Sequence, residues 1–240
     1  MRPSSGQDRI WSGVAALTAF TIAVWGSASF ASPAGEAEEA AEQQQLVNKA
    51  QQTLEDFSTH PELLAMIRDT AQDIKAIFIV PHLIRGGLVF GGAGGSGLLL
   101  VRYQETGDWS QPVFYTIGSA SLGLQLGLDT SELLMLVRTD RALRKFYHSS
   151  LTLGGDATMS LGPVGKGASL HGIKADLVAY ARTKGAFAGI ALDEAVIVAS
   201  DEANRLYYRQ PVKPTDILLK GSASNPGSEP LRKAAAALLK

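Results

Sequence analysis

The sequence contains no cysteine, which excludes disulfide bonds, thiolate zinc sites and a cysteine nucleophile. It also lacks an excess of charge of either sign, since 22 Lys and Arg stand against 23 Asp and Glu, for a formal net charge of −1. A general nucleic-acid-binding protein would be clearly basic, so nucleic acid is not an expected partner. Hydrophobic residues make up 45% of the 240 residues, so the chain can bury a core.

Catalytic and cofactor motifs are also missing, or fail in their context. Gly92–Gly97 matches G-x-G-x-x-G, but a turn at residues 105–108 leaves no room for the helix that a dinucleotide site requires. The stretch 162–167 suggests a phosphate-binding loop, but that pattern needs glycine at position 160, where Ser160 stands, and Ser or Thr after Lys166, where Gly167 stands. The four histidines have no metal-ligand spacing, and there is no G-x-S-x-G sequence. We therefore predict no catalytic residues, no metal and no cofactor.

The first 31 residues have the pattern of a secretory signal peptide. Arg2 and Arg9 precede an apolar run at residues 14–25, and small residues follow. The best cleavage point lies between Ala31 and Ser32, so we expect an exported protein, periplasmic or secreted. The uncharged stretch is long enough to span a bilayer, which takes about 20 residues. The alternative is therefore an uncleaved membrane anchor.

The next part of the chain predicts a tether and two helices. Residues 32–45 are acidic and polar, as in a tether leading into a helix. Apolar residues at helical spacing predict an amphipathic helix over 43–58 and a second one from Leu63 to Phe78, ending before Pro81. The polar face of the first helix has Lys49 as its only basic residue. Because interfacial helices usually carry a basic polar face, this favours packing on the sheet over insertion into a membrane.

From Gly86 onward, glycine-rich and β-rich runs alternate, separated by turns such as residues 105–108. This pattern predicts a mainly antiparallel sheet, strongly curled because glycines in strands permit bulges and tight bends. One helix is expected at 140–148, with Asp140 as its N-cap. The pattern of residues 211–240 predicts a linker and a short C-terminal helix. The predicted fold class is α+β, with N-terminal amphipathic helices packed on a mainly antiparallel, strongly curled, glycine-rich β-sheet.

Several short motifs follow one another in order along residues 61–210. They are Ile79-Val80-Pro81 with Arg85-Gly86-Gly87-Leu88-Val89-Phe90-Gly91, then Gly94-Gly95-Ser96-Gly97-Leu98, Trp109 with Pro112, Leu153-Gly154-Gly155-Asp156 with Gly162-Pro163-Val164-Gly165, and Tyr180, Lys184-Gly185-Ala186-Phe187-Ala188-Gly189 and Glu194. Together they resemble the lipid-binding SYLF domain family, which includes a yeast actin-binding protein. We place the SYLF-like domain at residues 46–210.

The resemblance implies an α+β domain that binds membrane lipid and has no catalytic activity, with phosphoinositides as ligands of eukaryotic relatives. We expect peripheral association with an anionic phospholipid membrane. The candidate lipid-binding residues are Arg85, Arg102, Lys145, Lys166 and Lys184, beside glycine turns formed by Gly94, Gly95, Gly97, Gly154, Gly155 and Gly165. Export would take the chain away from cytoplasmic actin, so actin is not an expected partner.

The alternative is a structural or protein-interaction domain of the cell envelope that does not bind lipid. An envelope protein partner would then bind the terminal segment 211–240. The two hypotheses differ in one structural consequence. Lipid binding through a basic patch requires the five basic residues to converge on one face, because the slightly negative net charge of the chain leaves only a local patch to attract an anionic surface.

Overall fold

The computed structural model describes residues 33–87, 90–122, 127–148, 150–165, 168–188, 192 and 194–240. The predicted signal peptide, residues 1–31, and Lys166 lie outside this part of the chain. Residues Ser32–Lys240 form one compact unit, and its buried apolar cluster runs from Val47 to Leu238. No helix within the described ranges is both long and apolar enough to cross a membrane.

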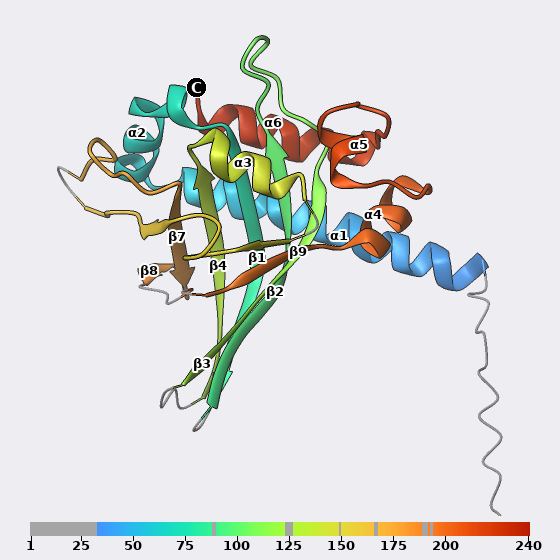
Figure 1. Cartoon of the computed structure of the whole chain (residues 1–240), viewed down its shortest axis with the longest axis horizontal. Coiled ribbons are helices and arrows are strands. Elements are labelled where there is room, and N and C mark those ends of the chain that lie inside the picture. The colour runs from blue at the N-terminus through green and yellow to red at the C-terminus, as the bar shows by residue number, and fades with distance from the viewer. Residues whose placement is uncertain are drawn as a thin grey trace, which may run out of the picture. The chain divides into compact units, whose positions relative to one another are not determined.

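The unit contains helices and strands in mixed order (Figure 1). They are α1 (Pro33–Ser58), α2 (Pro61–Asp69), the 3-10 turn η1 (Ala71–Asp73), β1 (Ala76–Gly87), β2 (Phe90–Val101), β3 (Val113–Leu122), β4 (Gly127–Val137), α3 (Asp140–Phe146), β5 (Ser150–Thr152), β6 (Met159–Leu161), β7 (Leu177–Thr183), β8 (Ala186–Ala188), β9 (Val196–Ala199), α4 (Asp201–Tyr208), α5 (Pro214–Leu218), the 3-10 turn η2 (Pro226–Ser228) and α6 (Glu229–Leu238).

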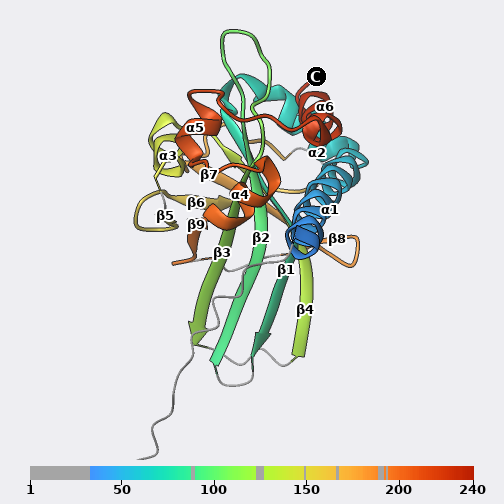
Figure 2. The ribbon, with the colours of Figure 1, turned by 90° about the vertical axis from the view of Figure 1, so that its right-hand side faces the viewer.

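The strands form one curled sheet in the order β5-β9-β3-β2-β1-β4-β7-β6, with β8 paired to β7 (Figure 2). All pairs are antiparallel except β6 with β7. Helix α1 lies across one face of the sheet and contacts β1, β2, α4 and α6. The predicted α+β class and the mainly antiparallel sheet are confirmed.

The N-terminal helices differ in extent from the prediction. Helix α1 begins at Pro33, so most of the expected tether is helical. Its apolar face is buried as predicted, with Val47, Ala50, Leu54 and Phe57 all almost fully covered. That face is therefore occupied by the core and is not available for a membrane.

The second predicted helix is too long. Helix α2 ends at Asp69, and β1 begins at Ala76. The helical spacing at Phe78 is misleading, because the five residues Ala76–Val80 form a continuous apolar run and all are fully buried. Such a run fits a strand covered on both faces, and periodicity alone does not separate it from a helix.

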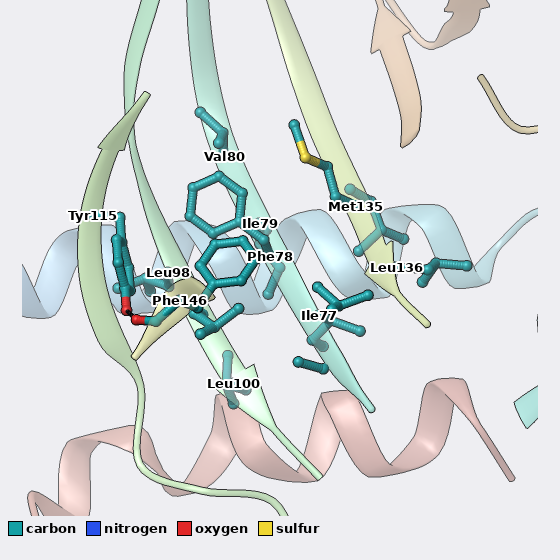
Figure 3. Close-up of a cluster of buried hydrophobic side chains, with 14 of the residues drawn as sticks. Ile77, Phe78, Ile79, Val80, Leu98, Leu100, Tyr115, Met135, Leu136 and Phe146 are labelled. Carbon is teal, nitrogen blue, oxygen red and sulfur yellow. Dashed lines mark hydrogen bonds between the residues drawn. The ribbon is translucent and has the colours of Figure 1, made fainter. Parts of the chain in front are cut away.

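The central strand β1 carries the middle of the core (Figure 3). Phe78 meets Tyr115 of β3 and Phe146 of α3, with ring centroids 6.1 and 5.9 Å away. The Tyr115 hydroxyl donates a hydrogen bond to the carbonyl oxygen of Phe146. Burial raises the pKa of Tyr115, so this hydroxyl stays protonated and keeps donating. Helix α3 is thus fixed on the sheet face opposite α1.

A bulge at Pro81 and His82 explains the glycines of β2. The register of β1 shifts by one residue against both β2 and β4 at this point. A Cβ added at Gly95 would lie 2.4 Å from the His82 carbonyl oxygen, and one at Gly97 would lie 2.7 Å from Phe78 Cζ. The prediction of a turn at Gly94, Gly95 and Gly97 is therefore wrong, because these residues lie inside β2, where the chains approach too closely for a side chain.

The C-terminal part is more ordered than a linker. Residues 211–240 contain α5 and the predicted terminal helix, α6, which buries Leu231, Ala235 and Leu238 and contacts α1.

The N-cap of helix α3 differs from the prediction. It is Thr139, not Asp140, because the Thr139 hydroxyl accepts a hydrogen bond from Ala142 N.

Candidate functional site

The candidate lipid-binding residues do not share one surface. Arg102 follows β2 and donates to the Ala71 carbonyl oxygen at 2.9 Å. Lys145 on α3 is paired with Asp156 at 2.7 Å. The fold brings together two of the candidates, Arg85 on β1 and Lys184 in the turn after β7. Arg102 and Lys145 lie elsewhere. The predicted five-residue patch is therefore absent from the part of the chain that the structure describes.

Arg85 and Lys184 are joined through Thr183. Arg85 Nη2 lies 2.9 Å from Asp129 Oδ2 of β4 and 3.5 Å from Thr183 Oγ1. Its side chain is only 14% exposed, and its Nε is buried without a hydrogen-bond partner among the described residues. Lys184 is exposed, and no described carboxylate lies within ion-pair distance. Lys184 is thus the cation here that is available to an external anion.

Next to them, Arg182 ties three elements together. Its Nε donates to Glu132 Oε2 of β4, and its Nη2 donates to Asp56 Oδ2 of α1, both at 2.6 Å. Burial lowers the pKa of Arg182, but the hydrogen bonds to the two carboxylates outweigh burial and raise it overall. We call Arg85, Asp129, Arg182, Glu132 and Lys184 the charged belt. Most of its charges neutralise one another, so the belt is not strongly basic.

Beyond the belt, strands β1–β4 continue past all the helices that the structure describes (Figures 1 and 2). We call this part the strand-end ribbon; it comprises Gly86–Gly87, Phe90–Gly92, Ala120–Leu122 and Gly127–Leu128. Gly86 pairs with Gly92 and Leu128, and Gly92 pairs with Ala120. The ribbon contains no charged residue. A solvent-facing ribbon would normally be polar, so this composition requires an explanation.

Three of the glycines expected in turns do lie in turns or loops. Gly154 and Gly155 do form a turn between β5 and β6, where Gly154 has φ +83. Gly165 has φ +106 in the loop after β6. These positive φ values favour glycine at Gly154 and Gly165. The backbone conformation alone therefore explains both glycines, and no role in ligand binding is needed.

Other residues that carry the family resemblance also have structural roles. The Tyr180 ring lies so close to Gly162 that an added Cβ there would be 2.1 Å from Tyr180 Cζ. The carbonyl oxygens of Trp109 and Pro112 accept hydrogen bonds from the C-terminal segment, from Arg232 Nε at 2.9 Å and from the Tyr208 hydroxyl. These motif residues maintain the fold.

A second site, which the sequence does not predict, is a polar cleft of about 350 Å³ between the loop after β2 and α6. Its charged lining is Arg102, Asp108, Glu229, Arg232, Lys233 and Lys240. Four cations thus face two carboxylates, and Arg232 Nη1 lies 2.9 Å from Glu229 Oε2. The cations come from segments more than a hundred residues apart, so no local motif signals the cleft. It lies at the end of the sheet opposite the strand-end ribbon (Figure 1).

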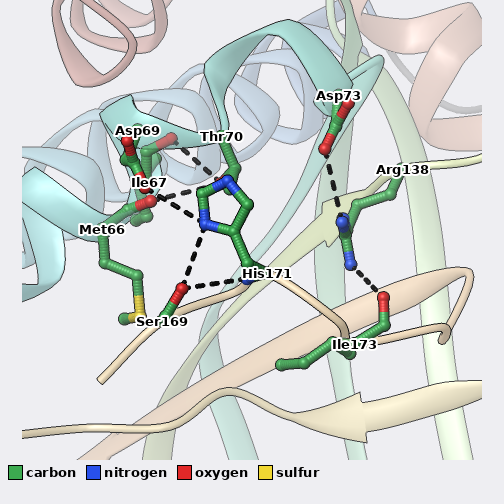
Figure 4. A network of polar contacts seen from close by, with 9 residues as sticks. All are labelled: Met66, Ile67, Asp69, Thr70, Asp73, Arg138, Ser169, His171 and Ile173. Carbon is green, nitrogen blue, oxygen red and sulfur yellow. Dashed lines mark hydrogen bonds and ion pairs between the residues drawn. The ribbon is translucent and has the colours of Figure 1, made fainter. Parts of the chain in front are cut away.

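The polar side chains around α2 form a structural network (Figure 4). His171 Nδ1 lies 3.2 Å from Asp69 Oδ2 and 3.1 Å from Ser169 Oγ. Arg138 Nη1 donates to the Ile173 carbonyl oxygen at 2.6 Å. This network fastens the loop before β7. In the described ranges, no group of three His, Asp or Glu side chains could hold a metal ion.

Comparison with known proteins gives the family. The model of the Ysc84 (SYLF) domain, described as "Las17-binding protein actin regulator", matches residues 118–238. The chain belongs to the Ysc84 family. Membership of the SYLF domain family, predicted from the ordered motifs, is therefore confirmed.

Relatives of the Ysc84 family resemble the chain over most of the compact unit. "SH3 domain-containing YSC84-like protein 1" of Bos taurus is 34% identical over 142 residues, 57% of this chain and 41% of the relative. The Homo sapiens protein of that name is 32% identical over 142 residues, with the same two coverages, 57% and 41%. "LAS seventeen-binding protein 3" of Saccharomyces cerevisiae is 31% identical over 147 residues, 58% of this chain and 31% of the relative. The chain thus matches less than half the length of these relatives, which are named for their domains and for binding.

Proposed function

We propose that this Ysc84-family chain is a non-catalytic module of the cell envelope that binds phospholipid membranes peripherally. One observation carries the proposal: an uncharged strand-end ribbon, which none of the described helices covers, extends from a belt of charged residues. A charged belt next to an apolar end matches the order of layers in a membrane, where polar head groups lie next to hydrocarbon.

Lys184 supplies the contact with an anionic head group. An exposed basic side chain near an anionic surface contributes roughly 1 kcal/mol. The other belt cations are paired with carboxylates, and the formal net charge of the chain is −1, so the electrostatic contribution is modest. Anionic phospholipids, phosphoinositides included, are the proposed ligands.

A protein-interaction role is the second candidate, and the polar cleft favours it. The cleft lies partly in residues 211–240 and presents an excess of cations to an acidic partner. The description of the family model names Las17 binding, which is an interaction with a protein. Because the cleft and the strand-end ribbon lie at opposite ends of the sheet, each role can be tested without disturbing the other.

Co-sedimentation with vesicles tests the proposed function. The full chain, and in parallel the compact unit 32–240, is mixed with neutral or anionic phosphatidylcholine-based vesicles at low salt and at roughly 0.15 M salt. We expect binding to both, stronger to anionic vesicles at low salt. Lys184→Glu should weaken binding to anionic vesicles about fivefold or more, because charge reversal removes one attraction and adds one repulsion.

Lys174→Glu is the matched control, because Lys174 is an exposed lysine at the other end of the sheet, beside the α2 network. It should leave binding unchanged. Absence of binding to every vesicle by a folded chain would contradict the proposal and favour the protein-interaction role.

A further inference from the structure

We infer that the strand-end ribbon inserts into the outer layer of the bilayer, up to the charged belt. This inference rests on the proposed function. It adds which part of the chain enters the lipid and how deeply that part inserts. The occupant is a phospholipid bilayer rather than a protein surface.

The amino-acid composition of the strand ends supports their insertion into lipid. No charged residue occurs from Gly86 to Val101 or from Trp109 to Leu128. The described strand ends include three large apolar residues of the sequence, Phe90, Leu122 and Leu128. Of the strand-end positions whose side chains are described, Ala120 is exposed. Ile84, next to Arg85 and opposite Thr130, is 55% exposed, more than any other large apolar side chain described on the sheet.

The position of the ribbon favours a bilayer over a protein partner. Strands β1–β4 run beyond every helix of the described residues, so none of these helices covers either face of the ribbon (Figures 1 and 2). A protein surface would cover one face and leave the other in water. A bilayer surrounds both faces and the end at once, which is the burial that an uncharged two-faced element requires.

The position of the charged belt sets how deeply the strand-end ribbon can enter the bilayer. Arg85, paired with Asp129 across β1 and β4, is the last charge before the ribbon on β1, and Asp129 is the first charge after it on β4. Three rows of paired residues follow the Arg85 row, those of Gly86, Gly87 and Phe90. At about 3.4 Å per residue, the ribbon reaches about 10 Å past the belt. This is less than one leaflet, since the hydrocarbon core is about 30 Å thick.

Open sheet edges exclude deeper insertion. Strand β9 pairs with β3 only as far as Gly118, and β7 pairs with β4 only from Ser131, so the ribbon's two outer edges have no neighbour among the described strands. Unpaired backbone N–H and C=O groups each cost several kcal/mol in hydrocarbon. In the interfacial layer, water and head groups can still bond to them. The ribbon therefore belongs in that layer.

Site-specific labelling tests the inference, because the chain has no cysteine and a single introduced one is unique. A polarity-sensitive fluorophore is attached at Ala120→Cys on the ribbon, at Ile84→Cys beside the belt and, as control, at Val198→Cys on β9. Val198 is 43% exposed and lies outside the ribbon. Circular dichroism confirms that each labelled chain is folded.

On mixing with phosphatidylcholine vesicles, the label at 120 should shift to the blue and brighten, the label at 84 should respond less, and the label at 198 should not respond. Lipids brominated near the head-group end of the acyl chains should quench the label at 120 more than lipids brominated at mid-chain. Co-sedimentation without a response at 120, or with an equal response at 198, would overturn insertion alone. Absence of co-sedimentation would overturn the proposed function, and insertion with it.

Discussion

Arg85 Nη2 of β1 lies 2.9 Å from Asp129 Oδ2 of β4, and the two residues are direct partners in the sheet. On one side of this ion pair the strands are covered by helices and bury the core. On the other side they continue without charge, and no helix of the described part of the chain covers them. The pair therefore marks the boundary between the part of the sheet that holds the fold together and the part that we assign to lipid.

Arg85→Ala separates a structural from a lipid-binding role for this arginine. Because the Arg85 side chain is 14% exposed and committed to Asp129, its loss should lower the free energy of unfolding by about 1–2 kcal/mol. Vesicle binding by the folded variant should change by less than about twofold. Urea denaturation and co-sedimentation measure the two effects. A loss of binding as large as that of Lys184→Glu would show that Arg85 itself contacts lipid.

Gly95→Ala tests the close approach of β2 to the β1 bulge. The added Cβ would lie 2.4 Å from the His82 carbonyl oxygen and 2.9 Å from Val80 Cγ1, so the strands must separate. We expect a loss of stability of about 2–3 kcal/mol, in the range for overpacking. Gly118→Ala on the neighbouring strand is the control, because its Cβ meets nothing within 4 Å. Equal midpoints of urea denaturation for the two variants would contradict this account of the glycines.

Asp176→Asn tests a buried carboxylate before β7. Asp176 accepts hydrogen bonds from Thr139 Oγ1 at 2.6 Å, from Thr158 N at 2.8 Å and from Arg141. Burial raises the pKa of Asp176, but these hydrogen bonds outweigh burial and leave the pKa well below its ordinary value. The variant should lose about 2–3 kcal/mol at neutral pH.

The pH dependence has a definite sign. Because the folded pKa of Asp176 lies below the unfolded value of about 3.9, its stabilisation is present above that pH and is lost as the pH falls toward the folded pKa. The stability difference between the natural chain and Asp176→Asn should therefore shrink below about pH 4. Urea denaturation from neutral to acid pH measures it. A difference that stays constant over this range would mean that the carboxylate charge is not the cause.

The sequence predicts the fold class because its patterns are local. Leu54 and Phe57 of α1, and Leu231 and Leu238 of α6, face the core at the expected helical spacing. The end of α2 is mispredicted because the short apolar run before Pro81 satisfies helical and strand patterns equally. The tertiary register decides between them, since Ile77 and Phe78 pair with β2 on one side and β4 on the other.

The candidate site is only partly predictable, because it depends on which distant residues the sheet brings together. Arg85 and Lys184 meet only through the pairing of β1 with β4 and of β4 with β7. The glycine-rich neighbourhood of Arg102 predicts a lipid-binding role, yet Arg102 lies in a cleft with Arg232 and Lys233 at the other end of the sheet. The uncharged runs at 86–101 and 109–128 are the sequence signal for the strand-end ribbon. Their meaning depends on the strand lengths and on where the described helices end along the sheet.

Placing a charge on the strand-end ribbon tests the central claim most directly. Leu122→Glu at the end of β3 is compared with Val198→Glu, which introduces the same charge at an exposed position on β9. In co-sedimentation with neutral phosphatidylcholine vesicles, where no lipid charge repels either variant, Leu122→Glu should bind at least about tenfold more weakly, since it introduces a charge at the end of the inserted ribbon. Val198→Glu should bind as the natural chain does. Equal binding by both folded variants would contradict the insertion of the strand-end ribbon.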